Sequence, residues 1–257
     1  MLGAIAGDII GSIYEFHNIK SESFELFYKV ISKFTDDTVL TCAIADSIIS
    51  RVSYAEKLIE YYHLYPGRGY GGSFGNWARK GGGPAYNSYG NGSAMRVSPV
   101  AYAFNDLNRV LEEAKRSADV THNHSEGIKG AQAVAAAIFL ARTGKSKSEI
   151  KKYIEKQFGY DLDFDLDNLK KNYTFNVTCQ GSVPQAIFAF LISKDFEDAI
   201  RKAVSIGGDS DTIACITGSI AEAFYGGVPE GIKKEVYARL DERLRTIVGE
   251  FSKKYIR

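Results

Sequence analysis

The chain has 257 residues, of which 45% are hydrophobic and 25% are charged, and its formal net charge is +1. This is the composition of a globular protein that can bury a sizeable core. A net charge so close to zero, with acids and bases scattered, excludes the basic footprint of a nucleic-acid-binding surface, so we expect no nucleic-acid partner.

Targeting signals are weak throughout the chain. No stretch has the roughly 18 uninterrupted apolar residues of a membrane span. The apolar N-terminus lacks a basic segment and contains Asp8 and Glu15, so it makes a poor secretion signal. The three cysteines, Cys42, Cys179 and Cys215, have apolar neighbours and no C-x-x-C spacing. This favours buried thiols in a reducing compartment, and we expect a cytoplasmic protein.

Helical periodicity dominates the first two thirds of the chain. Apolar residues recur at helical spacing over 39–48, and the segment 130–141, GAQAVAAAIFLA, is apolar nearly all round. A helix of that second kind is buried on several sides. The tract 160–169, YDLDFDLDNL, alternates instead, which allows a short exposed hairpin or a loop.

The C-terminal third continues the helical pattern. Residues 182–192 predict a helix with Ser182 as its N-cap and Pro184 in its first turn. A second apolar run follows Thr212 and ends at two glycines, and residues 229–246 predict a surface helix. With no domain boundary in sight, we expect an all-α fold with a single compact multi-helix domain over residues 1–257.

The segment 67–92 stands apart because it holds 10 of the 25 glycines of the chain, interspersed with aromatic residues. A flexible linker is rich in serine and free of aromatic residues, so this composition favours backbone that approaches a ligand closely. Gly67, Gly69 and Gly72 match G-x-G-x-x-G, but the match follows a helical stretch rather than a strand. A dinucleotide-binding fingerprint is therefore excluded.

Two predicted helices begin with an excess of acidic residues, TDDT at 35–38 and DSDT at 209–212. Helix capping explains one such side chain per helix. Adjacent carboxylates repel one another unless a cation lies between them. If the two helix starts meet, four carboxylates converge, and a cluster of oxygen ligands alone suits Mg²⁺, Mn²⁺ or Ca²⁺ rather than Zn²⁺. Four acids can hold two divalent ions.

Two further polar features each allow a structural and a functional interpretation. The motif THNHSEG, 121–127, is a thin candidate for zinc; it is either a helix start capped by Asn123 or Ser125, or a histidine at a ligand pocket. Glu15 follows Tyr14 in an apolar stretch. It is either an exposed helix residue, the simpler interpretation, or an acid whose pKa is raised near a site.

Taken together, these motifs resemble those of the ADP-ribosylglycohydrolase family, which includes the dinitrogenase reductase-activating glycohydrolases. The resemblance implies a compact all-α fold, a site for two divalent cations, Mg²⁺ or Mn²⁺, and hydrolytic removal of ADP-ribose from a modified acceptor. It extends in the family's order over residues 1–227 and is carried by GAIAGDIIGSIYEF, FTDDTVLT, SYGNGSAMRVSPVA, THNHSEGIKGA and GGDSDTIACITGSIAEAFYG.

The resemblance also assigns residues. It implies metal ligands from both acidic motifs: Thr35, Asp36, Asp37, Asp209, Asp211 and Thr212. It implies a substrate-binding set that holds the diphosphate, the distal ribose and the adenosine: Ser88, Tyr89, Gly90, Asn91, Gly92, His122 and Ser182. The catalytic acid or base would be one of four carboxylates: Glu15, Asp36, Asp37 and Asp209. Residues 144–180 match no motif, and we expect them to influence acceptor choice.

The expected reaction is cleavage of the glycosidic bond between the distal ribose and an acceptor nitrogen or oxygen, through an oxocarbenium-like transition state. Three alternatives stay open: a non-catalytic ADP-ribose reader, a hydrolase of a small ADP-ribosyl metabolite, and a structural helical domain with acidic caps. The sequence also leaves open whether the acceptor is arginine, serine, another side chain, a base or a metabolite. No sizeable exposed apolar stripe is evident, so we expect a monomer.

Overall fold

The computed structural model of the chain describes residues 1–256, in which fifteen α-helices account for the regular structure. The one β-type feature in that range is an isolated antiparallel bridge between Gly90 and Thr178. The expectation of an all-α fold is confirmed. The helices are α1 Leu2–Gly11, α2 Asp36–Ser50, α3 Tyr54–Leu64, α4 Gly72–Arg79, α5 Gly92–Met95, α6 Ser98–Ala103, α7 Leu107–Asp119, α8 Ser125–Arg142, α9 Lys147–Phe158, α10 Leu166–Asn172, α11 Cys179–Leu191, α12 Phe196–Ile206, α13 Ser210–Tyr225, α14 Glu230–Arg239 and α15 Glu242–Tyr255.

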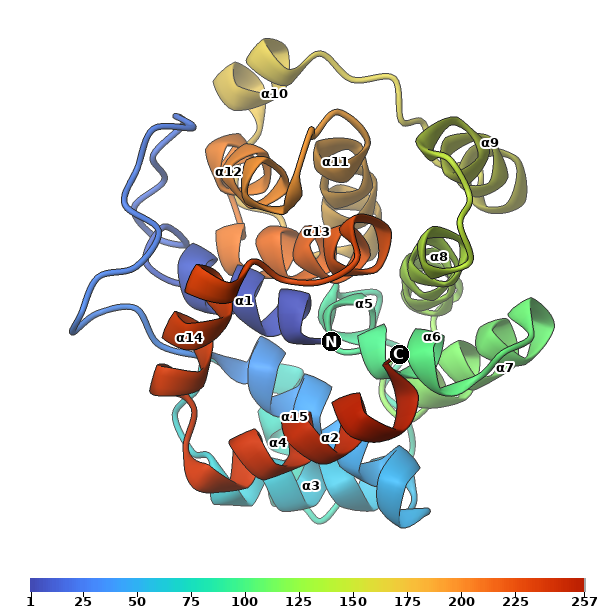
Figure 1. Cartoon of the computed structure of the whole chain (residues 1–257). Helices are drawn as coiled ribbons and strands as arrows, with labels where there is room; N and C mark the ends of the chain where they lie inside the picture. Colours follow the sequence, from blue (N-terminus) through green and yellow to red (C-terminus); the bar gives the residue numbers. More distant parts are fainter. Residues whose placement is uncertain (257) are drawn as a thin grey trace.

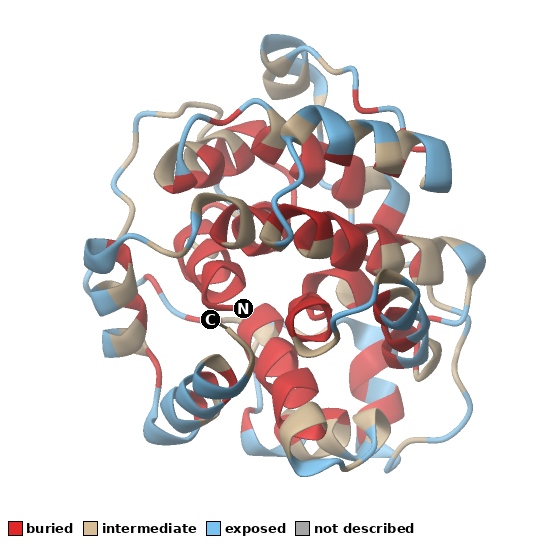
Figure 2. Ribbon diagram, turned by 45° about the vertical axis from the view of Figure 1, so that its right-hand side comes forward, coloured by how far each residue is buried: buried red, intermediate tan, exposed pale blue. Residues whose placement is uncertain are grey.

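Helices α1 and α13 form the centre of the molecule and pack along one another (Figure 1). Helices α11 and α12 cover one side of α13, and α8 packs against another. Helix α2 contacts α1 and is itself covered by α3 and α15. Figure 2 shows the consequence, because the central helices are buried nearly all round whereas the peripheral ones expose their outer faces.

A row of glycines explains how closely α1 approaches α13. Gly3, Gly7 and Gly11 are spaced by four residues and so lie on one face of α1. A Cβ on Gly7 would lie 2.0 Å from the carbonyl oxygen of Ala214, and one on Gly11 would lie 2.6 Å from the Cα of Asp211. Any side chain at these positions would force the helices apart, so the glycines fix where the start of α13 meets the end of α1.

The start of α11 differs from the sequence prediction. The helix begins at Cys179, three residues before the predicted cap, and Thr178 is the N-cap, whose side chain accepts a hydrogen bond from Gly181 N. The hydroxyl of Ser182 is instead engaged with Asn91, so the prediction of an N-cap at Ser182 is wrong. Pro184 consequently lies inside the helix rather than in its first turn.

Two other boundaries need correction, and the structure decides one alternative that the sequence left open. Helix α8 is capped by His124, whose Nδ1 accepts from the backbone of Glu126, and not by Asn123 or Ser125. The predicted helix over 229–246 is two helices, because Asp241 caps a new one through Leu244 N. Of the hairpin and the loop that the tract 160–169 allowed, the structure has the loop, over residues 160–165, and α10 begins at Leu166.

Two further expectations from the composition concern the cysteines and membrane-spanning segments. All three cysteines are buried and unpaired, as expected. Within residues 1–256, no helix combines the length and the hydrophobicity that crossing a bilayer requires.

Candidate metal centre and active site

The two acidic helix starts meet in the structure. The N-termini of α2 and α13 open into one cavity of about 370 Å³, whose wall includes all six residues of the predicted metal-binding set: Thr35, Asp36, Asp37, Asp209, Asp211 and Thr212. Thr35 caps α2 by accepting from Asp37 N at 3.3 Å. Asp209 occupies the N-cap position of α13 but makes no side-chain cap hydrogen bond. Capping alone therefore does not explain the doubled carboxylates.

A fifth aspartate, which the sequence analysis did not select, completes the cluster. Asp8 is fully buried on α1 and accepts hydrogen bonds from the hydroxyl of Thr35 at 2.7 Å and from the backbone N–H of Thr38 at 3.0 Å. Oxygen atoms of Asp8, Asp37 and Asp211 lie within 4.8 Å of one another. The sequence contained one signal for Asp8, because it is a carboxylate in an apolar helix that also carries a row of glycines.

A second group of oxygen atoms overlaps with the first. Glu15, Asp209 and Asp211 also place carboxylate oxygens within 4.8 Å of one another, so Asp211 belongs to both groups. Asp36 lines the same cavity but belongs to neither group. A Cβ at position 69 would lie 3.2 Å from Asp36 Oδ1, so glycine is the residue that fits beside this carboxylate. Two adjacent oxygen clusters joined by one residue can accommodate two cations.

The electrostatics of the cluster call for cations. Among residues 1–256, no lysine or arginine forms an ion pair with any of these aspartates or with Glu15. Burial, followed by the charge of Asp211, raises the pKa of Asp37 well above its usual range, and burial raises the pKa of Asp209 to about 6. Burial and the charges of Asp211 and Asp8 raise the pKa of Glu15 to about 8.

One buried atom supports the same conclusion. Asp37 Oδ1 has no hydrogen-bond partner, although an unsatisfied buried oxygen is expensive. A divalent cation would give this oxygen a ligand-bond partner and would neutralise the mutual repulsion. Oxygen-only donors fit Mg²⁺, Mn²⁺ or Ca²⁺, so the residues present fit the expected metal chemistry.

Asn91 connects the metal-binding cluster to the glycine loop. Its Nδ2 donates to Asp209 Oδ2 at 2.6 Å and to Ser182 Oγ at 3.0 Å. Ser182 in turn donates to the carbonyl oxygen of Asn176 at 3.0 Å. Ser182 is buried behind Asn91 and does not line the cavity, so it acts on the site through Asn91.

The rest of the predicted substrate-binding set divides into two parts. Ser88, Gly90, Gly92 and His122 line the cavity together with Asn91. Tyr89 does not, since its side chain is 48% exposed and its ring lies 5.2 Å from that of His124. The earlier glycines of the 67–92 segment also reach the cavity, which is bordered by Gly69, Gly71 and Gly72.

The mouth of the cavity is formed by two loop segments. Phe16, 75% exposed, follows Glu15, and its ring stacks on Phe175, 51% exposed, with centroids 6.0 Å apart. Phe175 and Val177 line the cavity and come from the segment 144–180, which matched no motif. That segment therefore does contribute to the pocket, on the side where Glu15 lies.

The loop that carries Glu15 is held firmly to the helices behind it. Lys20 donates to the carbonyl oxygens of Ile206 at 2.6 Å and Tyr173 at 2.8 Å, and Asn18 accepts from Gly208 N at 2.7 Å. The bonds to Ile206 and Gly208 fix the loop against the residues that precede Asp209, and the bond to Tyr173 ties it to the end of α10.

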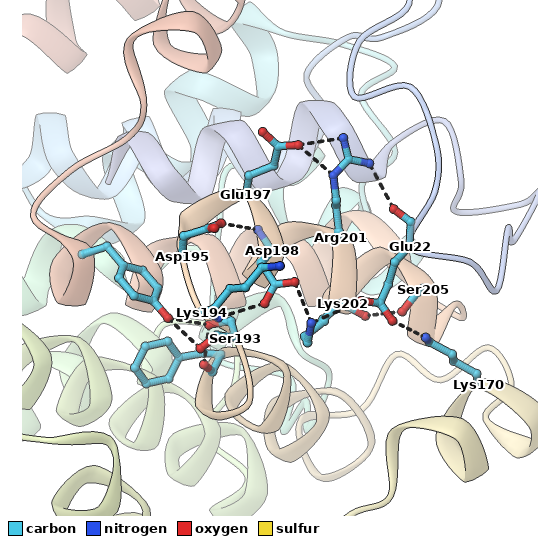
Figure 3. A network of polar contacts seen from close by, with 12 residues as sticks. Glu22, Lys170, Ser193, Lys194, Asp195, Glu197, Asp198, Arg201, Lys202 and Ser205 are labelled. Carbon is cyan, nitrogen blue, oxygen red and sulfur yellow. Dashed lines mark hydrogen bonds and ion pairs between the residues drawn. The ribbon is translucent and has the colours of Figure 1, made fainter.

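Further along the same loop, Glu22 joins one end of a polar network that extends along α12 (Figure 3). Its carboxylate pairs with Lys170 of α10 at 2.5 Å and with Lys202 of α12 at 3.2 Å, while its carbonyl oxygen accepts from Arg201 at 3.1 Å. The two segments that form the cavity mouth are therefore tied to each other and to α12.

A model of the family described as ADP-ribosylglycohydrolase matches residues 1–256. The chain belongs to the ADP-ribosylglycohydrolase family. This confirms the resemblance drawn from the motifs.

Individual family members give the same result. The human ADP-ribosylhydrolase ARH3 is 27% identical over 98% of this chain and 93% of its own length. The ADP-ribosylarginine hydrolase Tri1 of Pseudomonas putida (strain GB-1) is 27% identical over 95% of this chain and 75% of its own. A solved structure titled "ADP-ribosylglycohydrolase-related protein complex" superposes with a TM-score of 0.70 at 23% identity, covering 98% of this chain and 95% of that one. This last likeness supports the fold.

Proposed function

We propose that this protein is a metal-dependent hydrolase that cleaves the glycosidic bond between ADP-ribose and a modified acceptor, most often a protein side chain. The observation that carries the proposal is the pair of oxygen clusters that share Asp211 at the wall of a cavity also lined by the glycine loop. In a purely structural domain, acidic residues would only cap their own helices, and nothing would require acidic residues from three helices to line one cavity.

The cation-holding residues come from three helices and one loop. We propose that Asp8, Asp37 and Asp211 hold one ion and that Asp209, Asp211 and Glu15 border the other, with Thr35, Thr212 and Asp36 completing the two shells. Bound Mg²⁺ or Mn²⁺ would supply an activated water and orient ribose hydroxyls. The hydrogen bonds that Asp8 accepts from Thr35 and Thr38 hold the start of α2 in place beside the cations.

Proton transfer is assigned to the carboxylates that face the open part of the cavity. Glu15 borders both the cavity and a shallow depression outside it, beside Phe16 and Phe175. In this position it can exchange a proton with the leaving acceptor. Its raised pKa of about 8 means that it carries a proton at neutral pH until a cation is bound. Asp36, Asp37 and Asp209 remain the alternatives for the acid or base.

The nucleotide half would bind along the glycine loop. Backbone N–H groups of residues 88–92 can hydrogen-bond phosphate oxygens without a net positive charge, which suits a chain with a formal charge of +1. His122 and Ser88 border the same part of the wall. Asn91 would link the two halves of the substrate site, since it holds Asp209 from the loop.

Two alternatives keep the site and change its use. A non-catalytic reader would bind ADP-ribose without turnover, but all of the acidic ligands are present, which argues against it. A hydrolase of a small ADP-ribosyl metabolite would use the same cations with a different acceptor. The relatives named above support ADP-ribosylated substrates in general, and one of them is named an ADP-ribosylarginine hydrolase.

The proposal is tested with alanine variants of the two acidic motifs. Asp36→Ala and Asp209→Ala should each abolish the cation-dependent release of ADP-ribose, by about 10²-fold or more for the loss of a ligand or an essential carboxylate. Asp167→Ala is the matched control, because Asp167 is an exposed aspartate of α10 outside the cavity. Intact hydrolysis in both motif variants would refute the proposed site.

A further inference from the structure

Arg96 is a buried cation without an anionic partner. Its side chain is fully buried, and in the described residues no carboxylate pairs with it. Nη2 donates to the carbonyl oxygen of Ser117 at 3.1 Å and to Thr121 Oγ1 at 2.8 Å, whereas Nε and Nη1 have no partner. Burying an unpaired guanidinium is expensive, so its position calls for an explanation beyond packing.

The hydroxyl of Thr121 connects Arg96 to His122. Thr121 Oγ1 lies 2.7 Å from His122 Nδ1 and accepts from Arg96, which has donors only. The hydroxyl proton is therefore free to point at the imidazole. His122 Nδ1 and the hydroxyl of Tyr86 are the two acceptors that face this proton.

The other side of the imidazole faces the glycine loop. His122 lines the cavity, and its Nε2 would lie 3.2 Å from a Cβ on Gly92 and 3.6 Å from one on Gly90. Nε2 has no hydrogen-bond partner within the described chain. Burial, followed by the charge of Arg96, lowers the pKa of His122 well below its usual range, so the ring is neutral and carries a single proton.

We propose that Arg96 is a positioning residue: through the Thr121 hydroxyl it fixes His122 as the tautomer that carries its proton on Nε2. The cavity wall beside Gly90 and Gly92 then presents an N–H donor. This donor selects a hydrogen-bond acceptor in the ligand. The identity of the ligand as ADP-ribose rests on the proposed function, but the tautomer does not.

Tyr86 provides the competing arrangement. Its hydroxyl also faces Thr121, and its ring lies 6.1 Å from that of His122. If the Thr121 proton went to Tyr86, His122 would donate from Nδ1 and Nε2 would be an acceptor. The two arrangements make opposite predictions for the same ring, which makes them separable by experiment.

The test is nuclear magnetic resonance of the full chain with ¹⁵N-labelled histidine, which is practical because the chain has only 4 histidines. Long-range proton–nitrogen correlations distinguish the two neutral tautomers. Wild-type protein should show His122 with its proton on Nε2. Thr121→Val, which removes the hydroxyl and keeps the shape, should lose this preference, and Thr121→Ser, which keeps the hydroxyl, should retain it. Tyr86→Phe should also retain it.

A second readout measures ADP-ribose affinity by calorimetry. Thr121→Val should bind roughly three- to tenfold more weakly than Thr121→Ser, as expected when one hydrogen bond is lost. Arg96→Lys should bind ADP-ribose as weakly as Thr121→Val does, because lysine keeps the charge but not the geometry of the guanidinium. A proton on Nδ1 in wild-type protein, or identical spectra for the valine and serine variants, would overturn the proposal. If no variant binds ADP-ribose while the tautomer behaves as expected, the proposed function fails and the positioning role stands.

Discussion

Neutralising Asp211 should stabilise the cation-free protein while destroying its response to cations. Asp211 is the residue common to both oxygen clusters, and its carboxylate lies within 4.8 Å of those of Asp8, Asp37, Glu15 and Asp209. At an effective dielectric constant of about 20, two unit charges at such a separation repel by about 3 kcal/mol. Asp211→Asn removes this repulsion and keeps an acceptor oxygen for the N–H of Thr212, which Asp211 now binds at 2.9 Å.

The pH dependence follows from the direction of the pKa shifts. A carboxyl whose pKa is raised in the folded state holds its proton more tightly than in the unfolded chain, so stability falls as pH rises from the unfolded pKa to the folded one. Burial, followed by the charge of Asp209, raises the pKa of Asp211 well above its usual range, and Asp211→Asn removes this titrating group. The metal-free wild type should therefore lose stability relative to Asp211→Asn between about pH 4 and pH 7.

The assay is urea unfolding with a chelator at a series of pH values, with Asp167→Asn as the control for an exposed aspartate. Asp211→Asn should exceed wild type by about 3 kcal/mol near pH 7 and by little near pH 4. Adding Mg²⁺ or Mn²⁺ at a hundredfold excess over the dissociation constant should stabilise wild type by about 2.7 kcal/mol and the variant by much less. A variant that is less stable than wild type without metal at neutral pH would refute the reasoning.

Three further predictions concern other parts of the site. Gly7→Ala should cost about 3 kcal/mol or more in urea unfolding, because its Cβ would lie 2.0 Å from a backbone oxygen of α13; Gly249→Ala, which has open space around it, should be neutral or stabilising, and equal effects would contradict the close approach. Asn91→Ala should lower kcat/KM for ADP-ribose release by about tenfold, since Asp209 loses its donor, whereas Ser182→Ala should have a smaller effect through Asn91; the reverse order would contradict the relay. Glu15→Gln should lower kcat by about 10²-fold while ADP-ribose affinity stays within a few-fold, and an unchanged kcat would assign the proton transfer to an aspartate.

The sequence analysis stated the meeting of the two acidic helix starts as a condition for a cation site, and the structure brings them to one cavity. Two carboxylates in one helix turn exceed what a cap requires, and this excess is visible without coordinates. Asp8 was not predicted because a lone aspartate in an apolar helix carries no such excess. Its place in the cluster depends on how closely α1 and α13 pack, which the glycines at positions 3, 7 and 11 determine.

The roles of Ser182 and Tyr89 show a second limit. The resemblance placed both residues in the substrate-binding set, yet only contacts across the fold reveal that Ser182 acts from behind Asn91 and that Tyr89 lies outside the cavity. The predicted start of the helix that contains Pro184 came too late because of a contact between residues far apart in the sequence. Thr178 and Ser182 are equally good caps by type, and the hydrogen bond to Asn91 removes Ser182 from the choice.

The measurement that tests the central claim most directly is the release of free ADP-ribose from arginine-linked, serine-linked and O-acetylated substrates. Each reaction is run with Mg²⁺, with Mn²⁺ and with a chelator. The account predicts release from at least one acceptor that the chelator abolishes and that added Mg²⁺ or Mn²⁺ restores. Undiminished release in the chelator would contradict the metal centre, and tight ADP-ribose binding without release from any acceptor would establish a reader instead of a hydrolase.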